Sequence, residues 1–188
     1  MITAQKAYTM LANESLWDTA QQCHAILKDA DIPHALLGGI AVCLHGYQRN
    51  TVDVDLLVRR EEADAIRARL EAAGFVWSAK QAEFRSPTGI PVQLVLALDR
   101  AGPDSVVRLP DPSDNGAITS IEGLPVLKLA RLIESKLACG QGNLRRTHKD
   151  FADVVELIAC HQLNRSFARF LHKSLRVAFR ELVLRASA

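Results

Sequence analysis

The sequence has few of the residues that mark metal or thiol chemistry. Among its 188 residues are four cysteines and six histidines, and neither type recurs at a spacing typical of zinc ligands. The cysteines are scattered along the chain, at Cys23, Cys43, Cys139 and Cys160. Free cysteines behave as small buried hydrophobic residues, so we expect reduced thiols. The pattern supports neither a zinc site nor a Cys–His or Ser–His mechanism.

Long apolar runs, a leader segment and a strong net charge are also missing. No run approaches the roughly 20 apolar residues of a membrane-spanning helix, and residues 1–15 lack the basic-then-apolar order of a signal peptide. We therefore expect a cytoplasmic protein with no membrane partner. The net charge of +2 is too small to predict a nucleic-acid-binding protein by itself. A chain with 48% hydrophobic and 23% charged residues has the composition of a globular domain.

The spacing of apolar residues predicts an α+β fold with a mixed first part and a helical last part. In the first part, helices are predicted at 14–30, 40–46 and 61–73, and strands at 34–37, 51–58, 75–79, 82–86 and 91–98. In the last part, helices are predicted at 124–139, 147–161 and 165–184. We divide the chain into an α/β core at 1–100, a linker loop at 101–117 and a C-terminal helical part at 118–188, packed on the core.

The most specific feature is a pair of glycines followed by two aspartates. Thirteen residues separate Gly38-Gly39 from Asp53-Val54-Asp55. Residues i and i+2 of a strand point to the same side, about 7 Å apart at their Cα atoms given a rise of ~3.3 Å per residue. Two such carboxylates can share the hard cations that bridge a triphosphate. The glycines let the backbone approach a phosphate without a Cβ, and the helix predicted after them directs amide donors towards it.

This arrangement resembles the signature of the polymerase-beta-like nucleotidyltransferase superfamily. The string Arg49-x-Thr51-x-Asp53-x-Asp55 is also similar to one found in its small bacterial members. The resemblance implies a nucleotidyltransferase-like mixed β-sheet with flanking helices, followed by a C-terminal helical bundle. It implies transfer of a nucleoside monophosphate from a nucleoside triphosphate (NTP) to a hydroxyl, with two Mg²⁺ ions. The residues that it assigns to the nucleotide are Gly38, Gly39, Arg49 and Thr51, with Asp53 and Asp55 as catalytic and metal-binding residues.

A second block, in the helical part, resembles the abortive-infection (AbiEii-type) nucleotidyltransferase toxins. It comprises residues 124–127, residues 133–137 and the string Lys149-Asp150-x-x-Asp153. In that group a lysine and a lysine–aspartate pair help to line the nucleotide site. The resemblance therefore implies that Lys136, Lys149 and Asp150 bind nucleotide. It also implies a bacterial toxin–antitoxin setting with a cognate partner protein.

One position departs from the superfamily pattern. A third carboxylate usually comes from a neighbouring strand, and the strand predicted at 91–98 has Gln93 at the expected place. An amide carries no negative charge to hold a second cation or to accept the proton of the acceptor hydroxyl. Asp99 lies six residues further on and would need an unusual register. The sequence therefore leaves open whether the site is catalytically active.

Basic residues recur along the last predicted helix. Their steps of three or four positions predict one positive face, with apolar residues at the same steps on the opposite face. The basic residues are Arg165, Arg169, Lys173, Arg176 and Arg180. Such a face is either solvated or a docking surface for a polyanion such as RNA. Few aromatic residues are available for base stacking, which argues against sequence-specific binding.

Three functions follow from these patterns. The first is a Mg²⁺-dependent enzyme that transfers a nucleoside monophosphate to RNA, a protein side chain or a small-molecule hydroxyl. The second is a catalytically impaired nucleotide sensor or interaction module that retains the fold, because Gln93 replaces an acid. The third is an RNA-associated protein that uses the basic C-terminal helix.

Overall fold

A computed structural model describes residues 2–186, apart from the side chain of Leu144. Its centre is a mixed seven-stranded sheet in the order β3-β4-β5-β2-β1-β7-β6. The strands are β1 (His34–Leu37), β2 (Val54–Val58), β3 (Val76–Ser78), β4 (Glu83–Arg85), β5 (Pro91–Leu96), β6 (Ile118–Ile121) and β7 (Leu124–Leu127). The α-helices are α1 (Ala4–Met10), α2 (Glu14–Asp29), α3 (Gly38–Leu44), α4 (Ala63–Ala72), α5 (Leu129–Gly142), α6 (Leu144–Cys160) and α7 (Arg176–Ala186). The predicted α+β class, with a mixed sheet and flanking helices, is confirmed.

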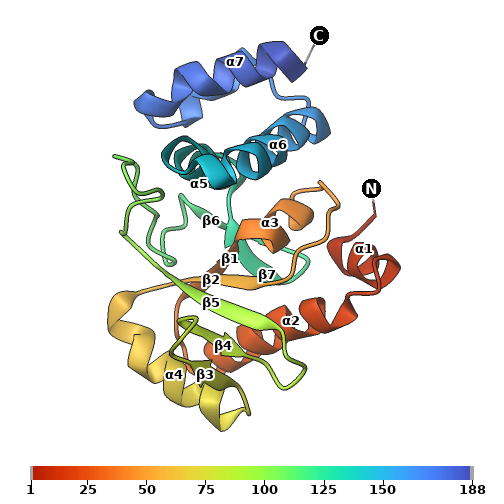
Figure 1. The fold of residues 1–188 in the computed structure, drawn as a ribbon, viewed down its shortest axis with the longest axis vertical. Helices are drawn as coiled ribbons and strands as arrows, with labels where there is room; N and C mark the ends of the chain where they lie inside the picture. The colour runs from red at the N-terminus through yellow and green to blue at the C-terminus, as the bar shows by residue number, and fades with distance from the viewer. Residues whose placement is uncertain (1, 187–188) are drawn as a thin grey trace.

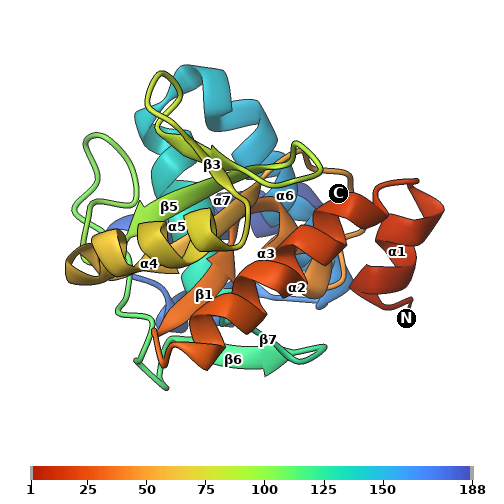
Figure 2. The same cartoon turned by 90° about the horizontal axis from the view of Figure 1, so that it is seen from below.

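Helices cover both faces of the sheet (Figure 1). Helices α2 and α4 lie across one face, as Figure 2 shows. Helices α3, α5 and α6 lie on the other face, and α7 packs on α6, away from the sheet. The central strands are buried on both sides: Val54, Leu56, Leu57 and Val58 of β2 have no exposed surface. No helix among residues 2–186 is long and apolar enough to cross a membrane.

The register of the central strands sets the position of the site. Strand β1 runs antiparallel to β2, with Leu37 opposite Asp55. Strand β5 runs parallel to β2, with Gln93 opposite Asp55. Because neighbours across paired strands point to the same face, Asp55 and Gln93 share the face that α3, α5 and α6 cover. The end of β1, where Gly38 follows, lies directly beside them.

The helical part begins later than the sequence predicts. Residues 124–127, predicted as the start of a helix, form β7, which pairs with β6 in an antiparallel hairpin. Glu122 and Gly123 connect the strands with positive φ values of 50° and 81°. Two adjacent residues with positive φ form the hairpin turn that matches the twist of two strands. The apolar run from this hairpin continues into α5, so periodicity alone did not separate the strand from the helix.

The predicted linker packs against the helical part. Residues 97–109 fold back on themselves. The Ala101 N–H donates to the Val107 carbonyl at 2.9 Å, and the backbones of Arg100 and Arg108 pair in an isolated antiparallel β-bridge. Gly102 lies so close to α5 that a Cβ on it would be 2.4 Å from the Ala138 carbonyl oxygen. This segment forms one wall of the candidate site.

The last predicted helix is broken into three pieces. Residues 165–184 form the 3₁₀ helices η2 (Arg165–Phe170) and η3 (Lys173–Leu175) and then α7. The helix is interrupted at Leu171, which has an extended backbone and is buried, and the next N–H, of His172, donates to the buried Glu134 carboxylate. These tertiary contacts outweigh the helical periodicity. The prediction of one straight basic helix face is therefore wrong.

Candidate functional site

The diglycine lies at the junction of β1 and α3. Gly38 has a φ of +66°, and a Cβ built on it would stand 1.8 Å from the Asp55 carboxylate oxygen Oδ2. A Cβ on Gly39 would stand 2.5 Å from the Thr51 hydroxyl oxygen. A side chain at Gly38 would be strained and would displace Asp55. Glycine at this position therefore lets the backbone lie against the acid.

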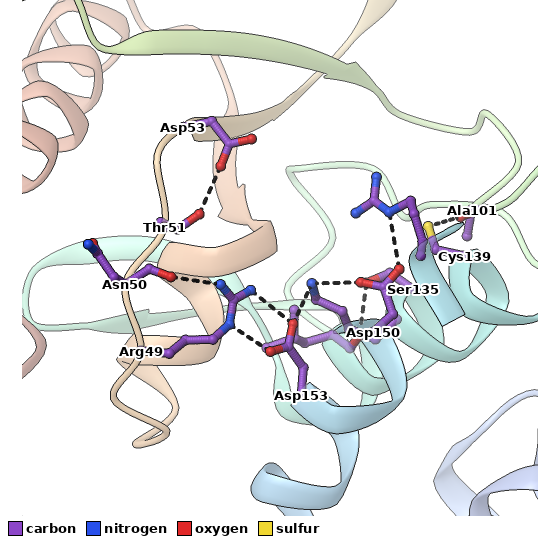
Figure 3. Close-up of polar contacts among 12 residues, drawn as sticks. Arg49, Asn50, Thr51, Asp53, Ala101, Ser135, Cys139, Asp150 and Asp153 are labelled. Carbon is purple, nitrogen blue, oxygen red and sulfur yellow. Dashed lines mark hydrogen bonds and ion pairs between the residues drawn. The ribbon is translucent and has the colours of Figure 1, made fainter. Parts of the chain in front are cut away.

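The two acids have different surroundings. Asp53 immediately precedes β2, and the Thr51 hydroxyl donates to its carboxylate at 2.8 Å (Figure 3). Asp55 lies within β2 and is half-buried. Burial, together with the negative charge of Asp53, raises the pKa of Asp55 to about 6, while the nearby cations Lys136, Arg146 and Lys149 act in the opposite direction. A cation bound between the two acids would relieve this cost.

A pocket of about 160 Å³ opens beside Asp55. Its polar lining comes from four parts of the chain: the β1–α3 junction, the central strands, the 97–109 segment and the helices α5 and α6. Those lining residues include Gly38, Asp55, Gln93, Arg100, Lys136, Arg146 and Asp150. Segments distant in sequence thus bring two acids, a glycine turn and three cations to one cavity.

A chain of ion pairs, drawn in Figure 3, forms part of the pocket wall. Lys136, with 5% of its side chain exposed, contacts Asp150 at 3.0 Å and Asp153 at 2.8 Å through its Nζ atom. Arg49 pairs with Asp153 at 2.6 Å, and Arg146 pairs with Asp150 at 3.1 Å. We call these five residues the buried ionic chain. It ties the segment before β2 to α5 and α6, so it sets how the helical part sits on the sheet.

The other sequence-predicted residues are distributed around this arrangement. Thr51 is buried and bonds to Asp53, while Lys149 is exposed and is not among the residues that line the pocket. Lys149 is nevertheless near enough for its charge to lower the pKa of Asp55. Gln93 lines the pocket, whereas Asp99 pairs with the exposed Arg60 outside it.

The five C-terminal basic residues do not line the pocket. Arg176 donates to the Leu171 carbonyl at 2.9 Å, so part of its role is structural. Arg169 stacks over the Phe170 ring, with 4.7 Å between the guanidinium carbon and the ring centroid. Helices α5 and α6 lie between α7 and the sheet (Figure 1). Any ligand of these residues therefore binds away from Asp55.

Sequence reasoning missed three residues of this region as site candidates. Arg146 and Arg100 line the pocket, and Asp153 is a central member of the buried ionic chain. For Arg146 a signal was present, since it stands four residues before Asp150 on one helix, the spacing of a helical ion pair. For Arg100 there was none, because the irregular fold of the 97–109 segment decides its position.

The donor set suits a hard cation that a bound triphosphate would help to hold. Among residues 2–186 no group of three or more His, Cys, Asp or Glu side chains is arranged to hold a metal by itself. Asp53 and Asp55 carry carboxylates, and Gln93 carries a neutral amide on the neighbouring strand. Mg²⁺ is commonly bound by one or two carboxylates together with substrate phosphates and water. These residues therefore fit Mg²⁺ bound as an NTP complex.

Comparison with known proteins identifies the fold. A family model, Aminoglycoside-2''-adenylyltransferase, matches residues 20–99, which run from within α2 to just beyond β5. The crystal structure of ANT(2'')-Ia in complex with adenylyl-2''-tobramycin is similar, with a TM-score of 0.56, 17% identity and coverage of 87% of this chain and 96% of that chain. The chain has a nucleotidyltransferase fold.

Two further structures agree with that assignment. A candidate nucleotidyltransferase from Thermotoga maritima has a TM-score of 0.51 and 18% identity, and the match covers 73% of this chain and 92% of that chain. A candidate nucleotidyltransferase from H. pylori has a TM-score of 0.53 and 18% identity, with coverage of 90% and 80%. No curated protein gives a significant match. The family match covers strands β1 to β5 with Gly38, Asp53 and Asp55, but not β6, β7, α5 and α6.

Proposed function

We propose that this chain transfers a nucleoside monophosphate from an NTP to a hydroxyl acceptor and depends on Mg²⁺. The observation that carries the proposal is the convergence of Gly38, Asp55 and Arg146 on one pocket from three separate segments. A triphosphate needs close backbone approach, a metal held by acids and fixed positive charge. Each requirement has a candidate residue at this pocket, on a fold of the matching type.

The residues take the following roles in this proposal. Asp53 and Asp55 hold the metal, which when bound neutralises charge on the triphosphate. Gly38 lets the Asp55 carboxylate lie against the backbone at the pocket, and Gly39 makes the same room for Thr51. Arg146 keeps 53% of its side chain exposed while pairing with Asp150, so its free N–H groups can donate to a phosphate.

The cations of the helical part divide into inner and outer groups. Lys136 is inner: Asp150 and Asp153 occupy its Nζ atom, so it contributes positive charge and holds the wall in place. Arg146 and Lys149 are outer and exposed, and they are the candidates for direct phosphate contact. Lys136 and Asp150 therefore act on the nucleotide indirectly, by holding the pocket wall in place. Arg49 also acts indirectly, because it holds Asp153 in position through their ion pair.

The charge at the pocket argues against a polycationic acceptor. An aminoglycoside carries several ammonium groups, which require unpaired carboxylates nearby. Of the two acids that line the pocket, Asp55 is assigned to the metal, and Asp150 is already paired with two cations. Arg100 and Arg146 are exposed at the same pocket. We therefore propose a neutral or anionic acceptor such as RNA, a protein side chain or a small hydroxyl compound.

A transfer assay tests this function. The protein is incubated with each α-phosphate-labelled NTP and Mg²⁺, together with RNA, with protein or with tobramycin. We expect label to be transferred to RNA or protein but not to tobramycin, and to be lost in both Asp53→Asn and Asp55→Asn. Transfer that persists in the two variants would contradict the assigned roles. Efficient labelling of tobramycin would contradict the acceptor class.

A second candidate function rests on Gln93. A chain that binds Mg²⁺ and NTP but transfers no label to any acceptor is the nucleotide sensor or interaction module that the missing acid suggests. The narrower resemblance to AbiEii-type toxins rests on the helical block with Lys136, Lys149 and Asp150. It predicts that expression of this chain alone slows bacterial growth and that a cognate partner protein relieves the effect.

A further inference from the structure

Three side chains form a row across neighbouring strands on the face of the pocket. Asp55 of β2 stands opposite Gln93 of β5. Strand β4 runs antiparallel to β5 with Phe84 opposite Val92, so the same register brings Glu83 beside Gln93. Directly opposed residues share a face. The row therefore reads Asp55, Gln93, Glu83, with the amide between two acids.

Glu83 is an unusual carboxylate because it is only 6% exposed. A buried carboxylate is costly unless charge or hydrogen bonds compensate it. The oxygen Oε1 lies 2.6 Å from an Arg85 Nη2 atom, and Oε2 accepts from the Gln93 amide nitrogen Nε2 at 3.4 Å. Glu83 is not among the residues that line the pocket, whereas Gln93 is. It therefore faces the back of Gln93 and not the ligand.

This contact determines which way the Gln93 amide is turned. An ionised carboxylate has only acceptors, so Gln93 has to present its NH₂ group to Glu83. The carbonyl oxygen of the planar amide then remains for the pocket side, where Asp55 lies on the next strand. Amide oxygens are ordinary ligands of hard cations, whereas an NH₂ group in that place would repel one.

We propose that Gln93 supplies a neutral oxygen to the cation held by Asp53 and Asp55, and that Glu83 is the positioning residue that turns its amide. This inference rests on the proposed function, because it assigns the third position of the same metal–triphosphate site. Gln93 on β5 thereby replaces the missing third acid with a neutral ligand. The negative charge of Glu83 lies one strand further from Asp55, on β4.

Metal affinity, measured without catalysis, tests the pair. Mn²⁺ is titrated into the full chain with a non-hydrolysable NTP analogue, and binding is followed by electron paramagnetic resonance. Glu83→Gln should weaken Mn²⁺ binding by about tenfold, the usual loss when a group that orients a metal ligand is removed. Glu83→Asp should also weaken it, because the shorter side chain keeps the charge but cannot reach Gln93.

A double variant separates orientation from a general structural effect. Gln93→Asp alone should gain little affinity, because the new carboxylate stands beside the charge of Glu83. Glu83→Gln combined with Gln93→Asp should bind Mn²⁺ at least as tightly as the unmodified chain. The matched control is Glu134→Gln on α5, which removes an equally buried carboxylate bonded to the His172 N–H. It should leave the affinity unchanged.

Each outcome decides between the two proposals. Unchanged Mn²⁺ affinity in Glu83→Gln, or failure of the double variant to recover, overturns the positioning role while the proposed function stands. If the unmodified chain binds the analogue equally well without Mn²⁺ and Asp55→Asn has no effect, the proposed function itself fails and this inference with it. Loss in Glu83→Gln that the double variant restores supports both.

Discussion

Replacing Lys136 with methionine tests the structural role of the buried ionic chain. The side chain is 5% exposed, and its Nζ atom contacts two carboxylates with side-chain exposures of 0% and 2%. Methionine keeps most of the volume but leaves Asp150 and Asp153 facing each other without the cation between them. Removing one partner from a buried ion pair costs about 3–5 kcal/mol, because the remaining charge stays buried.

The structure places Lys136→Met at the lower end of that range. Arg49 still pairs with Asp153 and Arg146 with Asp150, so each acid retains one partner. We expect a loss of about 3 kcal/mol in the free energy of unfolding. For a chain of this length, that corresponds to a fall of roughly 6–12 °C in the melting temperature.

Urea denaturation followed by circular dichroism measures this loss as a lower midpoint at an unchanged slope. Lys149→Met is the matched control, because Lys149 is exposed on the same helix as Asp150 and should change the stability by no more than ~0.5 kcal/mol. Lys136→Met combined with Asp150→Asn should recover part of the loss, since one uncompensated charge is gone. A loss below about 1 kcal/mol in Lys136→Met would refute the view that this lysine holds α5 and α6 together.

Three further perturbations examine the acid, the glycine turn and the C-terminal cations. Burial raises the pKa of Asp55 to about 6, so this carboxyl makes the native state less stable as the pH rises from about 4 to about 6. In EDTA, Asp55→Asn should therefore stabilise the fold at pH 8 by up to about 3 kcal/mol. Thermal melts should show this gain at pH 8 and no gain at pH 4. Gly38→Ala and Gly123→Ala both place alanine at a positive φ, but only the first meets Asp55, so calorimetry should show lost NTP binding in Gly38→Ala alone. Changing Lys173 and Arg180 to glutamine should leave NTP affinity unchanged and weaken RNA binding with a shallower salt dependence. Filter-binding assays with NTP and with RNA at several salt concentrations measure both affinities. A loss of NTP affinity would contradict this prediction.

Local sequence patterns predicted the parts of the fold that local physics decides. The strict alternation around Asp53 and Asp55 placed a strand, and the structure confirms β2, although it begins only at Val54. The diglycine after an apolar run predicted a strand, a turn and a short helix, as found at β1 and α3. The short helix α1 was not predicted.

Tertiary contacts determine the other features of the fold, and local patterns in a single sequence do not predict such contacts. Strand β7 and helix α5 form one apolar run that only the Glu122-Gly123 turn separates from β6. The break at Leu171 depends on the distant Glu134. The pairing of Lys136 with both Asp150 and Asp153 depends on how α5 and α6 pack, which helical periodicity does not specify.

The central claim is that Asp53 and Asp55 bind an NTP through a divalent cation, and calorimetry tests it most directly. Each of the four NTPs is titrated into the chain in Mg²⁺ and in EDTA, and again into Asp53→Asn and Asp55→Asn. We predict that at least one NTP binds in Mg²⁺, and that its affinity falls about tenfold or more in EDTA and in each variant, because a charged ligand of the cation is lost. Equal affinity in Mg²⁺ and in EDTA, unaffected by either substitution, would contradict the claim.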